Sequence, residues 1–349
     1  VLYFPKIKPN VEPQRNKIQL FQKQVFVTDS VEGIVPDFLT LLHGVIDSPD
    51  IPLNVSRSYL QADGNVKKIA SHITKKVADK LDEMFRKDRA DFESKWNDMK
   101  IIIEYGMLTE DKFFDKAKKF AMYSDTDGGL HTFDAYLESI KEHQTDKDKK
   151  TVVLYASNKE AQHSYIQNAK SKGYSVLLLD SPLTSHLLQK LEQEHENTTF
   201  ARVDSDLIDN LIKKDETRVA KLSDKQKEEL KTRLETIVPT EKFTLKLEDM
   251  DSTEAPLVIT VPEFMRRMKE MQMTGGGGMM GMGDFPDMYD LIVNANHPLA
   301  SKILDTEDAD ARSSAVNQAL DLAKLQQNLL HGEELTAFIA RSYEMLGNE

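Results

Sequence analysis

Few residues of this chain could carry out covalent chemistry on their own. The 349 residues include no cysteine, which excludes disulfides, thiolate catalysis and cysteine-bound zinc and fits a reducing compartment, here the cytoplasm. The nine histidines are scattered, without an H-x-x-x-H pair or a carboxylate cluster at the spacing of metal ligands. Signatures of serine hydrolases, P-loop proteins and zinc peptidases are absent as well. We therefore expect no metal site and no complete active site within the chain.

One acidic stretch, YSDTDGG at 123–129, matches a calcium-binding loop at three positions. It places Gly129 where a third ligand is needed, and the next residue is not the glycine that such a loop requires for its sharp turn. This stretch therefore predicts no calcium site.

Methionines gather in one segment of the chain. Half of the 14 methionines occur between residues 265 and 282, interleaved with glycines. An amphipathic helix is expected over 262–273, with Pro262 in its first turn and glycines from position 275 at its end. Its apolar face comprises Phe264, Met265, Met268 and Met271. Its opposite face comprises Arg266, Arg267, Lys269, Glu270 and Gln272. No regular element anchors the methionines that follow, Met273, Met279, Met280 and Met282.

Thioether side chains are long, unbranched and polarizable, so they can repack against many apolar partners. The segment from Phe264 to Met282 therefore predicts a surface that binds diverse apolar partners. Two alternatives stay open: the apolar face packs on adjacent strands, or the whole segment forms a structural flap.

The elements before residue 150 follow from apolar patterns. Residues 17–28 are expected to form a strand and 37–46 a short buried helix. A long helix is indicated by apolar residues at steps of three and four, namely Val66, Ile69, Ile73, Val77, Leu81 and Met84. Two more helical stretches are expected around 92–99 and 113–120.

After a charge-rich break at 141–150, buried strands at 151–157, 174–180 and 200–203 alternate with helices at 159–171 and 183–193. This alternation predicts a small parallel sheet with helices packed on it. The first strand runs into ASNKEAQ, without the glycines that a dinucleotide site needs. We therefore favour a packing domain without a cofactor, and a nucleotide-binding enzyme built on this sheet is the alternative.

The last part begins with a charged helical connection over 204–222. Ser223 and Gln226 form a capping box that opens the next helix. Strands are expected at 242–248, 256–261 and 289–296, and helices at 308–330 and 333–346, hinged at His331 and Gly332. The first of these helices carries an apolar band wider than one neighbour can cover, so the helix pair is expected to pair with a second copy. The alternative is that both helices fold back on their own domain.

The net charge and the length of the apolar runs argue against nucleic acid and membranes as partners. The net charge of −12 argues against binding to nucleic acid and to an anionic membrane. No apolar run reaches the roughly 18 residues that a membrane span needs, and no signal peptide is expected. The chain opens VLYFPKIKPN, without Met and reading like a strand, so we expect it to be a piece of a longer protein.

Taken alone, Arg57 is typical of a surface ion pair, but its surroundings are more specific. DSPDIPLNVSRSYLQ (47–61), preceded by QVFVTD (24–29) and VPDFLTLLHGVID (35–47), closely resembles the middle domain of the 90-kDa heat-shock chaperones. The resemblance is strongest over 17–90 and extends in order and length over the whole chain. Within the family, the chain is most similar to the bacterial high-temperature protein G type, because it ends LGNE without the M-E-E-V-D tail.

The resemblance implies a multidomain α/β (α+β) protein. The expected middle domain covers 1–205, with a larger αβα part (1–85), a helical part (86–148) and a small αβα part (149–205). A helical connection (206–222) and an α+β C-terminal dimerisation domain (223–349) that ends in a helix pair follow. The expected homodimer interface comprises Val316, Leu320, Ala323, Leu329, Leu335, Phe338, Ile339 and Leu346.

The resemblance also implies roles for the polar and the methionine-rich residues. Arg57 matches the arginine that contacts the ATP γ-phosphate in this family, and Gln61 matches a nearby glutamine. A guanidinium can bind phosphate oxygens and offset charge as the phosphoryl group leaves. ATP and Mg would bind a missing N-terminal domain, so this chain alone is expected to hold no cofactor and to hydrolyse no ATP. The helix at 262–273 and its methionine extension match the family's contact with partly folded client proteins. A structural dimeric scaffold without client binding is the remaining alternative.

Overall fold

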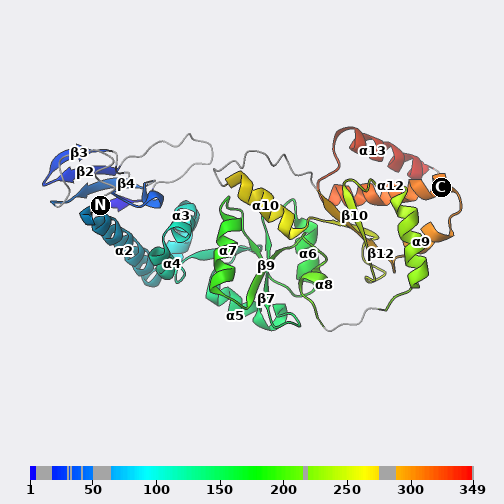
Figure 1. Ribbon diagram of the computed structural model, residues 1–349, viewed down its shortest axis with the longest axis horizontal. Coiled ribbons are helices and arrows are strands. Elements are labelled where there is room, and N and C mark those ends of the chain that lie inside the picture. The colour runs from blue at the N-terminus through cyan, green and yellow to red at the C-terminus, as the bar shows by residue number, and fades with distance from the viewer. Residues whose placement is uncertain are drawn as a thin grey trace. The chain divides into compact units, whose positions relative to one another are not determined.

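The computed structural model describes residues 1–4, 18–29, 31, 34–40, 42–49, 64–214, 219–274 and 288–347, without the side chains of residues 65 and 271–274. These residues fall into two compact units (Figure 1). Unit 1 comprises Val1–Ser139 and Ser181–His195, and unit 2 comprises Ile140–Asp180 and Glu196–Glu349. Each unit has a mixed α/β fold, which confirms the expected fold class.

Unit 1 contains a four-stranded mixed sheet in the order β1-β4-β2-β3. Its strands are β1 (Leu2–Tyr3), β2 (Ile18–Gln22), β3 (Val25–Thr28) and β4 (His43–Asp47). β4 runs parallel to β2, while β1 and β3 pair antiparallel with β4 and β2. Ile18 and Leu20 of β2 are fully buried, so this alternating strand supplies one side of the core.

Two sequence-based elements of unit 1 are wrong. The single strand expected over 17–28 is a hairpin, because Lys23 and Gln24 adopt positive φ angles of 49° and 67° and reverse the chain. The buried helix expected over 37–46 is a 3-10 turn, η1 (Asp37–Leu39), followed by strand β4. Pairing of β4 between β1 and β2 outweighs the local helical pattern, since a strand placed there satisfies its backbone groups on both sides.

Helices complete unit 1. They are α2 (Gly64–Lys87), α3 (Arg89–Thr109), α4 (Asp111–Ala117) and α7 (Thr184–Glu194). A hairpin of β5 (Met122–Asp125) and β6 (Leu130–Thr132) follows α4 in the chain. The long amphipathic helix expected over Val66 to Met84 is confirmed by α2. Helix α3 approaches η1 at Gly106, where a Cβ would lie 2.6 Å from the Phe38 ring, so only glycine fits there. Helix α5 (Phe133–Gln144) carries the chain into unit 2.

Unit 2 begins with a parallel sheet. Its strands lie in the order β8-β7-β9, with bounds β7 (Thr151–Ala156), β8 (Val176–Leu178) and β9 (Thr198–Arg202). Both pairings of β7 are parallel, as the alternation of strands and helices predicted. Helices α6 (His163–Ser171) and α8 (Ile208–Leu211) add apolar residues to its core. The connection expected to be helical over 204–222 is helical only at α8 in its described residues.

A second sheet of unit 2 has the order β10-β12-β11. Its strands are β10 (Phe243–Glu248), β11 (Leu257–Thr260) and β12 (Tyr289–Asn294). The helices around it are α9 (Asp224–Glu235), α11 (Pro298–Asp305), α12 (Ala309–Gln326) and α13 (Gly332–Gly347). Ser223 and Gln226 form the expected capping box at the start of α9. These elements enclose a core that includes Leu234, Ile259 and Val316.

The division into two units differs from the expected domains, because unit 2 contains both the small parallel sheet and the C-terminal elements. The domain boundaries expected at 205 and 222 therefore stay predictions. Among the described residues, no helix has the length and apolar content required to cross a membrane.

Candidate functional site

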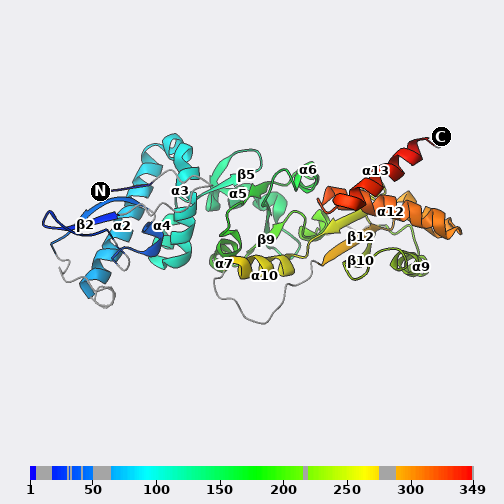
Figure 2. The same ribbon diagram turned by 90° about the horizontal axis from the view of Figure 1, so that it is seen from above.

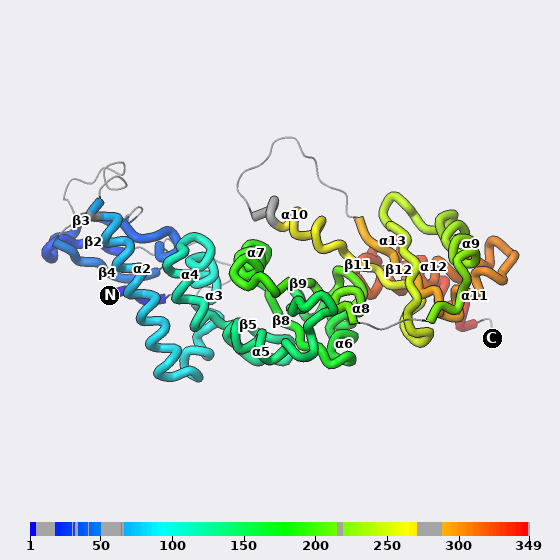
Figure 3. Tube along the Cα trace, turned by 60° about the horizontal axis from the view of Figure 1, so that its bottom comes forward, coloured from blue at the N-terminus to red at the C-terminus, as the bar shows by residue number. Residues whose placement is uncertain are grey.

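The helix predicted over 262–273 exists as α10 (Glu263–Thr274). It follows β11 closely in the chain and lies beside β9 of the parallel sheet in unit 2 (Figures 1 and 3). Pro262 stands just before it, and its carbonyl accepts a hydrogen bond from Arg266 N at 3.2 Å. Pro262 is therefore the N-cap of α10, one residue before the first-turn position expected from the sequence.

Helix α10 turns its charged side toward the sheet. Arg266 is only 8% exposed, whereas Phe264 is 71% exposed and Met265 is 36% exposed. Met268 is half-buried. The predicted polar face, which includes Arg266, is therefore the face turned toward the sheet, and the alternative in which the apolar face packs on the strands does not describe Phe264. The reason is the chemistry of the sheet beside α10, which presents hydrogen-bonding groups.

The hydroxyl of Tyr155, in β7, is central to this contact. It donates a hydrogen bond to Glu263 Oε1 at 3.0 Å and accepts one from Arg266 Nη2. The guanidinium carbon of Arg266 also lies 5.6 Å from the centre of the Tyr155 ring. Burial, together with the charge of Glu263, raises the pKa of Tyr155, so this hydroxyl remains a protonated donor.

The charges of α10 are paired within the helix. Glu263 Oε1 lies 2.6 Å from Arg266 Nη2 and 2.7 Å from Arg267 Nε, and Glu270 Oε1 lies 2.5 Å from Arg266 Nη1. Burial alone would raise the pKa of Glu263, but the charges of Arg266 and Arg267 outweigh burial and hold this pKa below its ordinary value. Two carboxylates and two guanidiniums thus form a group without net charge.

This polar contact extends along the end of β9. Arg267 Nη2 donates to the carbonyl oxygen of Phe200 at 2.9 Å, and Arg202 N donates to Glu263 Oε2 at 3.3 Å. The Arg202 side chain forms a two-pronged pair with Asp204 at 2.6 and 3.0 Å. Because Asp204 is 2% exposed, its charge needs this partner.

The end of β7 is filled by a side chain of the protein itself. Gln162 Oε1 accepts hydrogen bonds from the backbone N–H groups of Ser157 and Asn158 at 2.8 and 3.0 Å, and Gln162 Nε2 donates to Asp204 Oδ1 at 2.8 Å. In nucleotide-binding sheets, backbone N–H groups at this place bind phosphate. Their use by buried Gln162 speaks against a nucleotide site on residues 151–203.

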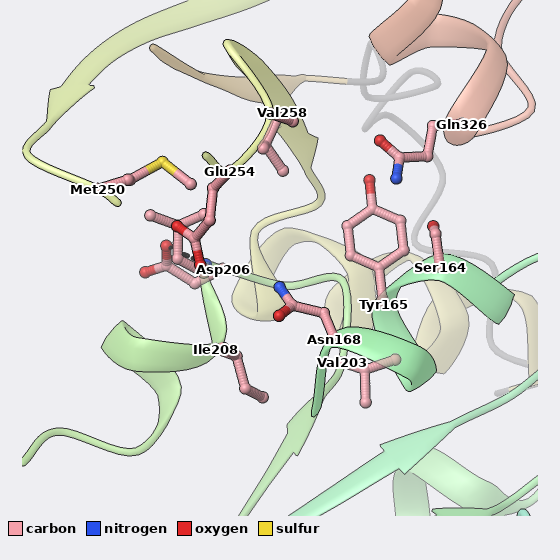
Figure 4. Close-up of a pocket in the computed structure, with 12 residues that line it drawn as sticks. Ser164, Tyr165, Asn168, Val203, Asp206, Ile208, Met250, Glu254, Val258 and Gln326 are labelled. Carbon is pink, nitrogen blue, oxygen red and sulfur yellow. Dashed lines mark hydrogen bonds between the residues drawn. The ribbon is translucent and has the colours of Figure 1, made fainter. Parts of the chain in front are cut away.

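A nearby pocket of about 250 Å³ offers phosphate no better site (Figure 4). Its lining residues come from α6, α8, β11, the end of α12 and the segments after β9 and before β11. They include the carboxylates Asp206 and Glu254 but no lysine or arginine. Phosphate recognition relies on cationic side chains or clustered N–H donors. The pocket is therefore unsuited to a nucleotide.

Several expected site residues lie outside the described residues. These are Arg57, Gln61, Met279, Met280 and Met282, together with the side chains of Met271 and Met273. The phosphate-contacting role of Arg57 and the partner-binding role of the methionine extension therefore stay predictions. Among the described residues, no cluster of His, Asp or Glu could hold a metal ion.

The helix pair α12 and α13 separates the expected interface residues into two sets. Val316, Leu320 and Ala323 are buried in the core of unit 2, and Leu329 packs against that core. Helix α13 has no buried residue, and Leu335 and Phe338 are half-buried. Ile339 and Leu346 are exposed. Helix α13 lies against α12 (Figure 2), and α12 itself exposes two further apolar residues, Leu322 and Leu325. The expected interface stays a prediction.

Tyr155 and Arg202, which hold α10, were not among the residues singled out from the sequence. One signal could have identified them: Tyr155 is the only aromatic residue in the aliphatic strand TVVLYA. A second signal is the spacing of Glu263, Arg266, Arg267 and Glu270, which places opposite charges three and four residues apart on one helix face.

Comparison with known proteins supports the resemblance seen in the sequence. The model of the Hsp90 protein family matches residues 1–347. The chaperone protein HtpG of Porphyromonas gingivalis is 51% identical over 329 residues, which cover 93% of this chain and 48% of that protein. The chaperone protein htpG of Bacteroides fragilis is 43% identical, with 99% of this chain and 60% of that protein covered.

A more distant relative, the chaperone protein HtpG of Myxococcus xanthus, is 26% identical and matches 96% of this chain and 51% of its own length. The chain thus spans about half to three fifths of the length of these relatives. Since the family model matches nearly every residue, the chain belongs to the Hsp90 protein family.

Proposed function

We propose that this chain is part of a cytoplasmic molecular chaperone that binds partly folded client proteins through the outward face of α10. The observation that carries the proposal is the exposure of Phe264 and Met265 on a helix fixed by its charged side. The relatives reported above are named chaperone proteins. An apolar surface held toward solvent suits binding to clients, because partly folded proteins expose apolar side chains.

Flexibility of the contact residues supports the same proposal. Met265 can adopt several side-chain conformations, and the thioether adapts to partners of different shape. Phe264 supplies a large apolar ring at its side. The methionines of the extension, Met273, Met279, Met280 and Met282, would enlarge this client-binding surface.

The same proposal assigns two further roles. Arg57, assisted by Gln61, would contact the γ-phosphate of Mg-bound ATP in a separate N-terminal domain and so promote its hydrolysis. The C-terminal helices would join two copies, which would place two client-binding surfaces in one molecule. Support for the second role comes from α13, whose apolar residues are not buried within unit 2.

The client-binding role is tested by changing Phe264 and Met265 together to serine. Loss of two apolar contacts is expected to weaken client binding by about tenfold or more. The measurement is suppression of light scattering by a heat-aggregating client. Phe26→Ser is the matched control, because Phe26 is an exposed phenylalanine (55%) of unit 1. Unchanged suppression by the double variant would refute binding through α10 and would favour a structural scaffold.

A further inference from the structure

We infer that the Tyr155 hydroxyl is a positioning group that docks α10 on the sheet, and that α10 can detach from this group while the rest of unit 2 stays folded. The inference concerns how the helix is held. Its consequence for clients rests on the proposed function.

The first argument is that α10 does not depend on the sheet to neutralise its charges. Glu263, Glu270, Arg266 and Arg267 pair with one another through contacts of three and four residues along the same helix. Such pairs can persist in a helix that has left its docking surface. Detachment would break the looser ion pair between Glu270 Oε1 and Arg202 Nη1 of β9, at 3.8 Å, but it leaves the pairs within the helix intact.

The second argument is that the contacts between α10 and the strands are polar at their centre. They include the two hydrogen bonds of the Tyr155 hydroxyl, the bond from Arg267 to the Phe200 carbonyl, the bond from Arg202 N to Glu263, and the 3.8 Å ion pair between Arg202 and Glu270. Water can replace each of these bonds when the helix leaves. The net stabilisation from such exchangeable bonds is modest compared with burial of large apolar side chains.

The third argument is that docking leaves one donor unused. Arg266 Nε is buried and has no hydrogen-bond partner among the described residues. A buried donor without a partner raises the free energy of the docked state relative to a state in which water reaches it. Docked and detached states of α10 are thereby brought closer in free energy.

Helix α9 shows the contrasting arrangement and serves as the internal reference. It has 12 residues, as α10 does, but it packs through Leu230 and Leu234, which are fully buried. Detachment of α9 would expose both leucines to water. Exchange of its backbone amides is therefore expected to require opening of the unit 2 core.

The docked state fixes which side of α10 a partner meets. With Arg266 against Tyr155, Phe264 points into solvent, while detachment would free both faces of the helix. In the proposed chaperone, Tyr155 would thus determine how the client-binding surface is presented.

The test is hydrogen–deuterium exchange of the whole 349-residue chain with Tyr155→Phe, without any client present. This change removes the hydroxyl and keeps the ring. Amides of α10 are expected to exchange about tenfold faster or more, because two hydrogen bonds to charged groups are lost. Amides of β7, β9 and α9 should keep their rates. Tyr123→Phe is the matched control, since Tyr123 is a buried tyrosine of unit 1.

Unchanged exchange in α10 would overturn the inference. Equal acceleration in β7 and β9 would show a packing defect, and Arg267→Gln then decides, because it removes the contact to the Phe200 carbonyl and the pair with Glu263 and leaves Tyr155 in place. Faster exchange confined to α10 in that variant supports the docking contact, and any other pattern overturns it. The exchange experiments contain no client, so a negative result with Tyr155→Phe or Arg267→Gln does not bear on client binding. Client binding is tested separately by the variant of Phe264 and Met265.

Discussion

Gln318 in α12 and Ser342 in α13 link the last two helices, with Gln318 Nε2 donating to Ser342 Oγ at 3.0 Å. Arg341 Nε donates to Gln318 Oε1 at 2.9 Å and strengthens this polar link. The apolar residues of α13 take no part in it: Ile339 is 44% exposed and Leu346 is 77% exposed. Helix α13 is thus held on its own unit by hydrogen bonds, and its apolar side remains available.

The first prediction concerns self-association. Ile339→Glu combined with Leu346→Glu is expected to weaken dimerisation at least about tenfold, because like charges would replace apolar contacts between two copies. Sedimentation velocity over a range of protein concentrations measures the effect. Val219→Glu is the control, since Val219 is an exposed apolar residue (81%) in the segment before α9, outside the helix pair. A double variant that sediments like the unchanged chain at every concentration would contradict the interface.

The second prediction concerns pH. The pKa of Glu263 in the folded chain is lowered from 4.5, so its ion pairs stabilise the fold fully above pH 4.5, and this stabilisation is lost as pH falls through the lowered pKa. Glu263→Gln is therefore expected to cost about 2 kcal/mol at pH 7. The difference in the free energy of unfolding between the unchanged chain and the Glu263→Gln variant should shrink as the pH falls below 4.5 and through the lowered pKa of Glu263.

Calorimetric unfolding of both chains between pH 7 and pH 3 provides the measurement. Glu241→Gln is a suitable control, because Glu241 is an exposed carboxylate just before β10. A stability difference that stays constant across this range would show that the Glu263 carboxylate does not act through its charge.

The third prediction concerns ATP. In a protein that joins this chain to an ATP-binding domain, Arg57→Ala is expected to lower ATP turnover about 100-fold or more, because a guanidinium on the γ-phosphate stabilises charge in the transition state. Arg57→Lys should recover only part of the rate, since an ammonium lacks the planar fork of donors. ATP turnover that is insensitive to both changes would remove Arg57 from the mechanism.

The sequence predicted those elements in which local pattern and tertiary packing agree. The amphipathic helix α2, the parallel strands around β7 and the capping box of Ser223 and Gln226 are confirmed. In each case the apolar or capping residues that identify the element are also the residues that it uses. Helix α10 was likewise predicted as an element, with its bounds within one residue of the observed ones.

Other features depended on partners that are distant in the sequence. The turn at Lys23 and Gln24 lacks the glycine or asparagine that normally marks positive φ angles, so no local signal divides β2 from β3. Strand β4 is set by its neighbours β1 and β2, against its helical pattern. The contact that holds α10 was missed because it depends on Tyr155, more than 100 positions earlier in the chain.

The exposed side chains of α10 and α13 also bear on how the protein behaves when it is concentrated. Phe264 and Leu346 expose apolar surface on two different helices, and such surface promotes non-specific association between copies of the chain. The net charge of −12 opposes this association, because molecules of like charge repel each other before their apolar surfaces come into contact. Colloidal stability is therefore expected to depend on ionic strength. Repulsion keeps the molecules apart at low ionic strength, whereas high salt screens the repulsion and favours aggregation.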